Sequence, residues 1–473
     1  MFYLHDFISA VTQQSSRPLD IAINGVVIDS RQATQGSLFV ALPGEQTDGH
    51  QFVQAAFING ATAALIDQEL DLPFPVIDLR SGKFNPNDLP QQQPVCLRVD
   101  NTLVALQKFA QVWREKHPIR TIGITGSVGK TSTKELTASL LAHRYQVLKN
   151  PGNRNNEIGL PLTLTELKPD HECAVLEMGF YVLGEIKTLC EIAKPDVGIV
   201  TNIGTVHAER AGSQEMIARG KAELVESLPT APTGTAILNM DDPWVKWMAD
   251  RTQAQILFYG VNEQADLMAS DIKSHGLQGI SCTLTYEGKD HIIQSPLLGE
   301  FSAYTILCAT AAALVEGLSW ETITKALLES QSNIRMRHFT LDNGVTVIDD
   351  TYNATPESTT AALKFLKGMK GRRVAVLGDM LELGQYEQQG HQSVGEAAAR
   401  CADYLILVGP RSEITAASAI KSGFSENNVK WYPDSHQASL SIGKSIQHGD
   451  FVLIKGSNSM KMDIILRELE EHS

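Results

Sequence analysis

The run Thr121-Ile122-Gly123-Ile124-Thr125-Gly126-Ser127-Val128-Gly129-Lys130-Thr131-Ser132 decides the fold class, because an apolar strand leads into a glycine-rich turn closed by Lys-Thr. Backbone N–H groups of such a turn surround phosphate oxygens, the lysine bridges β- and γ-phosphates, and the threonine hydroxyl can ligate Mg²⁺. A helix expected from Lys130 directs the positive end of its dipole at the same anion. We therefore expect an ATP or GTP site formed by Gly126, Ser127, Val128, Gly129, Lys130, Thr131 and Ser132.

The spacing of this loop departs from the general phosphate-loop pattern. It is G-x-x-G-x-x-G-K-T, and Ile124 stands where G-x-x-x-x-G-K-[ST] has its first glycine. A plain glycine turn with a surface lysine is the alternative. The strand before the loop and the helix after it favour nucleotide binding.

Length and composition describe an ordinary globular chain. The 473 residues are 43% hydrophobic and 20% charged, and domains of about 100–200 residues predict three domains in a chain of this length. The net charge of −14 argues against a broad nucleic-acid-binding surface. An anionic substrate would then meet local cations, for which Lys130, Arg335 and Lys455 are the candidates.

The cysteines and the N-terminus indicate a reducing compartment. The chain has six cysteines without a C-x-x-C pair, several of them inside apolar runs, so we expect buried thiols. No basic segment followed by a long apolar stretch opens the chain, and no run is long enough to span a membrane. We expect a cytoplasmic monomer.

Strand and helix patterns predict three α/β domains. Residues 1–117 form the first, with strands expected at 26–31 and 37–42 and a helix at 52–60. Residues 118–332 form a central phosphate-loop domain, whose continuous apolar runs at 173–177 and 197–202 are typical of a parallel sheet covered on both faces. Residues 333–473 alternate strand and helix and predict a Rossmann-like domain, with strands at 345–349, 374–377, 404–408 and 451–455.

Polar side chains follow the strands of the central domain. Glu177 ends one buried strand and His207 comes shortly after the next, at the edge where open α/β sheets place their ligands. Both are candidate metal ligands, because Mg²⁺ near a phosphate loop needs only one or two protein groups. A salt-bridged acid and a structural histidine are the alternatives. The loop 151–161 is rich in Asn and Gly, and either orients a phosphate or carboxylate or forms a plain turn.

Together these segments resemble the Mur ligases of bacterial cell-wall synthesis over nearly the whole chain. The shared signatures are Asp29-Ser30-Arg31, Asp48-Gly49-His50, the phosphate loop, 153–161 and 201–207. The motifs Asp350-Thr351-Tyr352-Asn353-Ala354-x-Pro356, Gly378-Asp379-Met380-Leu381-Glu382-Leu383-Gly384 and Lys455-Gly456-Ser457-x-x-Met460 resemble the members that add D-alanyl-D-alanine to UDP-N-acetylmuramoyl-tripeptide. No Asn-Pro-Arg motif of the members that add one amino acid is found in the third domain.

The resemblance implies an ATP-dependent ligase that forms an acyl phosphate and then an amide, giving the UDP-MurNAc-pentapeptide of peptidoglycan synthesis. It implies catalytic roles for Lys130, His207, Lys221 and Arg335, and Mg²⁺ bound by Thr131, Glu177 and His207. ATP would also contact Arg335 and Asp350. Substrates would contact Ser30, Arg31, Asn153, Asn156, Tyr352 and Asn353.

Lys221 has two interpretations. The resemblance implies a lysine carbamylated by CO₂, whereas the residue taken alone is a solvated helix lysine. Three residues depart from the family pattern: Ser302 and Thr305 replace asparagines expected to contact adenine, and Thr355 replaces the asparagine before Pro356. The alternatives are a ligase that adds a single amino acid and a non-catalytic ATP-binding regulatory protein.

Overall fold

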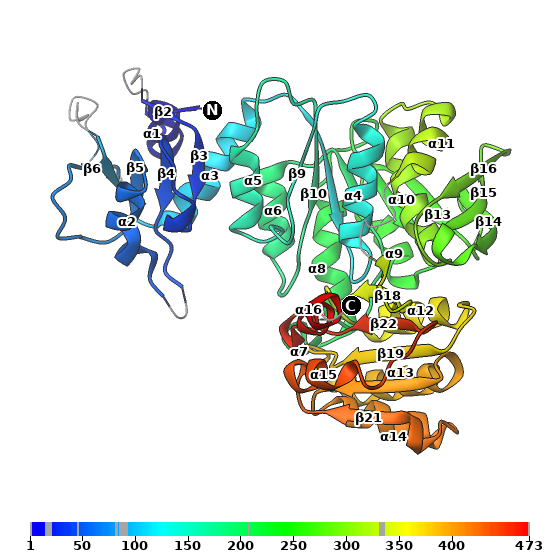
Figure 1. Ribbon diagram of the computed structural model, residues 1–473. Coiled ribbons are helices and arrows are strands. Elements are labelled where there is room, and N and C mark those ends of the chain that lie inside the picture. The colour runs from blue at the N-terminus through cyan, green and yellow to red at the C-terminus, as the bar shows by residue number, and fades with distance from the viewer. Residues whose placement is uncertain are drawn as a thin grey trace. The chain divides into compact units, whose positions relative to one another are not determined.

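The computed structural model describes residues 2–14, 21–44, 47–80, 84, 93–206, 208–330 and 336–471. Figure 1 shows the elements in chain order. The fold divides into two compact units, of which the first comprises Met1–Thr121, Tyr145–Gly179 and Lys187–Pro195, and the second Ile122–Arg144, Phe180–Ile186 and Asp196–Ser473. The expected domain boundary at residue 333 lies outside the described residues.

The first unit contains a five-stranded parallel sheet in the order β3-β4-β5-β7-β6. Its strands are short because buried apolar runs such as that of β4 alternate with turns. Phe39, Ala64 and Cys96 pack together in its core. The elements of this unit are β1 Phe2–Tyr3, α1 Leu4–Thr12, β2 Ala22–Ile23, β3 Gly25–Val27, β4 Ser37–Val40, α2 Val53–Ile58, β5 Ala63–Ile66, β6 Val76–Asp78, β7 Val95–Arg98, α3 Thr102–Glu115, β9 Val147–Lys149, α5 Gly159–Thr165, β10 Cys173–Glu177 and most of α6 Glu185–Ala193.

The strand expected at 26–31 is wrong beyond Val27. A 3₁₀ turn, Ser30–Gln32, follows instead, because the Asp29 carboxylate accepts a hydrogen bond from Arg31 N at 3.0 Å. An aspartate that caps the backbone in this way favours a turn over a continuing strand.

The first part of the second unit carries the phosphate loop. Its strands follow the order β16-β15-β14-β13-β12-β11-β8. Strands β8, β11, β12, β13 and β14 run parallel to one another, β15 pairs antiparallel with β14, and β16 pairs antiparallel with β15. β11 and β12 are buried throughout, as a parallel sheet covered on both faces requires. The elements are β8 Arg120–Thr125, α4 Lys130–Leu141, β11 Val197–Val200, α7 Ala208–Ala211, α8 Gln214–Glu226, β12 Thr235–Asn239, α9 Pro243–Trp247, β13 Gln255–Gly260, β14 Leu267–Ser274, β15 Ile280–Tyr286, β16 Lys289–Ser295, α10 Ser302–Val315 and α11 Trp320–Glu329.

The second part is a doubly covered sheet in the order β17-β18-β22-β19-β20-β21, parallel except for β17 (Figure 1). Successive residues of β19 alternate between two cores: Val374 and Val376 face α15 and α16, whereas Ala375 and Leu377 face α12 and α13. The elements are β17 Arg337–Thr340, β18 Thr346–Asp350, α12 Pro356–Lys367, β19 Arg373–Gly378, α13 Glu387–Cys401, β20 Tyr404–Val408, α14 Ser412–Lys421, β21 Val429–Tyr432, α15 Ser435–Ile442, β22 Phe451–Lys455 and α16 Asp463–Glu471.

Two expectations about the whole chain can be checked against these elements. The six cysteines are buried free thiols, as expected. Within the described ranges, none of the helices has the length and hydropathy that crossing a bilayer requires.

Candidate active site

The phosphate loop connects β8 to α4 and is held by the end of the neighbouring strand β11. Val128 N donates to Asn202 Oδ1 at 2.9 Å, and Thr201 Oγ1 and Asn202 Nδ2 donate to Val128 O at 2.7 and 2.9 Å. Ser127 Oγ accepts a hydrogen bond from Gly204 N at 2.9 Å. The loop is therefore fixed in shape by side chains of the adjacent strand.

Two glycines have conformations that this loop needs. Gly126 has φ of +144°, and a Cβ there would lie 1.9 Å from Thr201 Oγ1. Gly129 has φ of +88° and forms the N-cap of α4, and a Cβ there would meet no atom within 4 Å. The open side of Gly129 faces the cavity, where a phosphate can approach the backbone closely.

Lys130 is the first residue of α4, as expected. Its Nζ donates to Gly126 O at 2.7 Å and to Ser127 O at 3.3 Å, which holds the ammonium over the loop. The helix N-terminus, the glycine backbone and this ammonium together form a site suited to a polyphosphate.

A cavity of about 700 Å³ opens beside the loop, entirely within the second unit. One end is formed by Val128, Gly129 and Ser132 of the phosphate loop and α4. Its walls come from the turn after β12, from the segment 297–308 and from the first loop of the C-terminal sheet. Among the residues on the walls are Asp241, Asp242, Trp244, Phe301, Tyr304, Asp350, Glu357 and Lys455.

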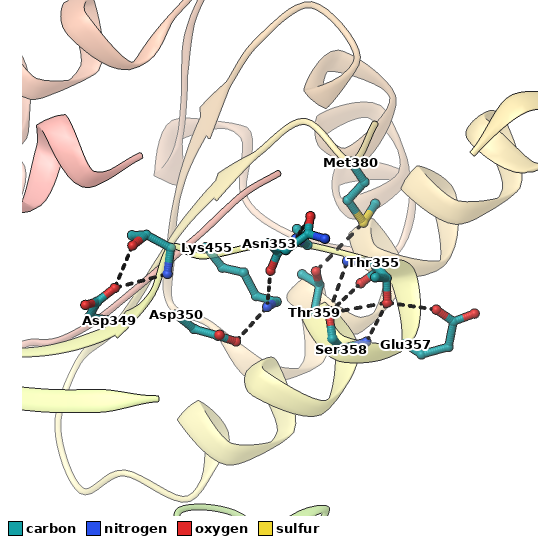
Figure 2. Close-up of polar contacts among 11 residues, drawn as sticks. Asp349, Asp350, Asn353, Thr355, Glu357, Ser358, Thr359, Met380 and Lys455 are labelled. Carbon is teal, nitrogen blue, oxygen red and sulfur yellow. Dashed lines mark hydrogen bonds and ion pairs between the residues drawn. The ribbon is translucent and has the colours of Figure 1, made fainter. Parts of the chain in front are cut away.

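The C-terminal side of the cavity contains a buried ion pair. Lys455 Nζ donates to Asp350 Oδ2 at 2.6 Å and to Asn353 O at 2.8 Å (Figure 2). The side chains of Lys455 and Asp350 are 0% and 7% exposed. Lys455, which the sequence suggested as a free cation for an anionic substrate, is therefore neutralised by Asp350.

Thr355 caps helix α12. Its Oγ1 accepts from Ser358 N at 3.1 Å and donates to Glu357 Oε2 at 2.9 Å, as Figure 2 shows. Thr355 is thus the N-cap of α12, a position at which threonine and asparagine are both favoured.

In the first unit, Glu177 ends β10 and is 2% exposed. Its Oε1 accepts a hydrogen bond from Asn155 Nδ2 at 2.8 Å, and Asn150 bonds its backbone at both N and O. The amide-rich loop thus holds the carboxylate in place. Asn156 Oδ1 accepts hydrogen bonds from Ile158 N and Gly159 N, just before and at the start of α5, at 3.3 and 2.9 Å, whereas Asn153 is exposed.

Lys221 lies on α8 and is fully buried, so the interpretation as a solvated lysine is wrong. Its Nζ lies 5.1 Å from the centre of the Phe180 ring. The reason for the burial is close packing, because a Cβ on the neighbouring Gly220 would lie 1.9 Å from that ring.

The remaining predicted residues differ in exposure, and two of them lie outside the described residues. Arg31 is exposed and forms a bidentate pair with Asp29, whose pKa the guanidinium and the Arg31 backbone N–H lower to about 2. Ser30 is buried and Tyr352 is 42% exposed. His207 and Arg335 are outside the described residues, and among the described ones no three His, Cys, Asp or Glu side chains gather as a metal site.

The cavity also contains residues that sequence reasoning missed. Asp241, Asp242 and Trp244 follow β12 at the same sheet edge as Asn202, which is a signal that could have found them. Phe301, Ser302, Tyr304 and Thr305 belong to the segment in which Ser302 and Thr305 depart from the family pattern.

Three family models match successive parts of the chain. The Mur ligase family catalytic domain matches residues 22–114, the Mur ligase middle domain 124–313, and the Mur ligase glutamate ligase domain 334–458.

Similar proteins cover the chain from end to end. A UDP-N-acetylmuramoyl-tripeptide–D-alanyl-D-alanine ligase of Synechocystis is 37% identical and covers 99% of this chain and 96% of its own. The crystal structure of MurF from Acinetobacter baumannii has a TM-score of 0.84 at 29% identity, with 99% of both chains covered. MurF of Thermotoga maritima in complex with ADP has a TM-score of 0.79 at 26% identity, covering 96% of this chain and 99% of that one. The expected α/β architecture is confirmed, and the chain belongs to the Mur ligase family.

Proposed function

We propose that this chain is an ATP-dependent ligase that joins D-alanyl-D-alanine to UDP-N-acetylmuramoyl-tripeptide, giving the UDP-MurNAc-pentapeptide of peptidoglycan synthesis. The likeness over the full length to ligases of that name supports the choice of substrates. The observation that carries the chemistry is a single cavity lined both by the phosphate loop and by the 350–358 loop of the C-terminal sheet.

The first step transfers the γ-phosphoryl group of ATP to an oxygen of the tripeptide's terminal carboxylate, and ADP leaves. Lys130 and the backbone N–H groups of 126–132 bind the phosphates and stabilise the charge that develops on them. Asp350 contacts the nucleotide from the C-terminal side, and Arg335 contributes a further cation. The ADP in the Thermotoga maritima relative is consistent with a nucleotide in this family's fold.

The residues present suit Mg²⁺, because a threonine hydroxyl and a carboxylate are the hard oxygen ligands it prefers. Thr131, Glu177 and His207 would hold it. When bound, Mg²⁺ neutralises phosphate charge during transfer. The hydrogen bond from Asn155 to Glu177 fixes the carboxylate that would serve as ligand.

In the second step the dipeptide amine attacks the acyl-phosphate carbon, the amide C–N bond forms, and phosphate leaves with the amine's proton passing to solvent or base. Tyr352 and Asn353 contact the dipeptide, Ser30 and Arg31 the UDP-sugar, and Asn153 and Asn156 the peptide carboxylates. The reaction consumes ATP, so we place it in the cytoplasm. We also expect the chain to act as a monomer.

Lys221 acts as a carbamate in this proposal. A buried ammonium would repel a neighbouring metal, whereas the carbamate formed with CO₂ is an anion that attracts one. Lys221→Ala should lose activity that a short carboxylic acid restores. Lys134→Ala, which removes another fully buried lysine, should not respond to the acid. Absence of rescue at Lys221 would contradict the assignment.

The function is tested by phosphate release from ATP with UDP-N-acetylmuramoyl-tripeptide and D-alanyl-D-alanine. Release that depends on the dipeptide, with a pentapeptide product, supports the proposal. Turnover of the UDP-MurNAc-dipeptide with diaminopimelate or lysine alone would assign a ligase that adds one amino acid. ATP binding without any product would assign a regulatory protein.

A further inference from the structure

The cavity has a phosphate end and a far end, and the far end is where the base of a bound nucleotide would lie. Val128, Gly129 and Ser132 define the phosphate end. The far end is built by the turn 241–244 and the segment 297–305. A nucleoside triphosphate anchored at the loop extends toward these two segments. The following inference rests on the proposed function, because it concerns the nucleotide of that reaction.

The carboxylates at the far end are already used within the protein. Asp241 accepts hydrogen bonds from the backbone N–H groups of Val261, Asn262 and Glu263 at 2.7, 3.1 and 2.7 Å, and from Tyr304 Oη at 2.8 Å. Asp242 accepts from Ile203 N at 2.8 Å and from Trp244 N at 2.9 Å. Both acids hold the loop backbone and have little capacity left for a base.

The neutral polar side chains there are used in the same way. Asn239 donates to Thr201 O at 2.9 Å and accepts from Asp241 N at 3.0 Å. Ser302 Oγ donates to Leu298 O at 2.7 Å, and Gln214 Nε2 donates to Ile203 O at 2.8 Å. Tyr304 remains a phenol that donates to Asp241, since burial and that carboxylate raise its pKa.

Among the described residues, the surface left for a base is apolar apart from the hydroxyl of Thr305. Pro243, Trp244, Leu297, Leu298 and Phe301 line this end, and Phe301 is 39% exposed. Aromatic and aliphatic side chains hold a purine through stacking and contact area, to which every purine contributes its π-face equally.

From this pattern of hydrogen bonds we propose that the cavity binds the purine by shape and stacking and does not recognise the amino and carbonyl groups on the edge of the base. The chain would then use inosine and guanosine triphosphates in place of ATP. A site built to hydrogen-bond a group rejects its analogue by about 10⁴-fold or more, whereas an apolar pocket discriminates by about 10–200-fold at most. We therefore expect the kcat/KM values for ATP and ITP to differ by less than about 100-fold.

The test measures phosphate release with ATP, ITP and GTP under the conditions of the ligase assay, together with calorimetric binding of ADP, IDP and GDP to the full chain. An ATP to ITP ratio below about 100 in both readouts supports the inference, and a larger ratio overturns it. If ADP and IDP bind alike and no nucleotide gives product, the proposed function fails and the inference stands. If product forms with ATP and the ATP to ITP ratio exceeds about 100, the inference fails and the proposed function stands.

Thr305 provides the variant that probes the wall directly. Thr305→Val removes its hydroxyl at nearly the same volume, and the ATP to ITP ratio should stay within about threefold, because that hydroxyl does not read the base. Thr305→Asn adds an amide that can pair with adenine, and should raise the preference for ATP by about ten- to hundredfold. Thr322→Asn on α11, outside the cavity, is the matched control. A collapse of ATP use but not ITP use in Thr305→Val would overturn the inference.

Discussion

The buried pair of Lys455 and Asp350 gives the sharpest test of the C-terminal side of the site. Lys455→Met keeps the apolar stem and removes the ammonium, which leaves a carboxylate that is 7% exposed without its cation. Removing one partner of a buried ion pair costs about 3–5 kcal/mol, because the remaining charge stays desolvated. This is a large share of the roughly 5–15 kcal/mol by which a typical domain is stable.

The loss in free energy of unfolding is best measured locally, because a chain of several domains need not unfold in one step. Hydrogen exchange followed by mass spectrometry gives the opening free energy of peptides that cover β18 and β22. Lys455→Met should lower it by about 3–5 kcal/mol. Asp350→Asn should lower it less, because the amide oxygen and Asn353 O can still accept from the ammonium.

The double variant decides between an ion pair and two independent contacts. If the two charges stabilise each other, the double variant should recover about 2–3 kcal/mol relative to the sum of the single variants. The exposed pair Arg467 and Asp463 on α16 is the matched control, with side chains 71% and 46% exposed, and neutralising it should cost less than about 0.5 kcal/mol. Single-variant losses that add within about 0.5 kcal/mol would refute the reasoning.

Three further outcomes follow from the structure. Thr137→Val and Thr310→Val should each raise stability by about 1 kcal/mol in thermal melts, because both hydroxyls are fully buried without a hydrogen-bond partner in the described part of the chain; a loss would contradict this. Gly129→Ala should weaken ADP binding in calorimetry while Gly288→Ala should not, since both glycines have positive φ (+88° and +73°) and open space at Cβ but only Gly129 lines the cavity. Hydrogen bonds from the backbone and ring of His50 lower the pKa of Asp48 to about 2 from 3.8, so the first unit should lose stability as the pH falls from about 4 to 2; hydrogen exchange of residues 47–68 should show this loss, and Asp48→Asn should reduce it.

Local patterns were enough to predict the elements that carry the phosphate chemistry. The helix begins at Lys130 and the strand ends at Glu177 as expected, because a glycine turn, a buried apolar run and helix propensity are all set by residues close in sequence. The burial of Lys221 could not be predicted in this way. It depends on the Phe180 ring, which is forty-one residues earlier in the chain and is placed by packing.

The far end of the cavity was missed for a related reason. Ser302 and Thr305 depart from the family pattern, so the sequence predicts no adenine contact there, yet α10 packs beside α4 and turns Ser302, Tyr304 and Thr305 toward the cavity. Where a helix lies is fixed by its buried face, and substitutions on the cavity face leave that position unchanged. A residue that departs from a motif therefore indicates which groups that wall of the cavity recognises. It does not indicate whether the helix forms the wall.

The acidic side chains of the cavity walls also hold the structure, whereas the cationic groups that bind phosphate lie at the phosphate loop. Its described walls carry the acids Asp241, Asp242, Asp350 and Glu357, of which Asp350 is neutralised by a cation and the other three keep their charge while accepting hydrogen bonds from neutral groups. The first two accept backbone N–H groups, Asp350 accepts from Lys455, and Glu357 accepts from Thr355. These contacts hold the loops and leave the neutralisation of phosphate charge to the opposite end, where Lys130 and the N-terminus of α4 lie. The separation explains how a chain with a net charge of −14 can bind a polyanion: the attraction is concentrated on one loop, and the rest of the wall is shaped by hydrogen bonds already made.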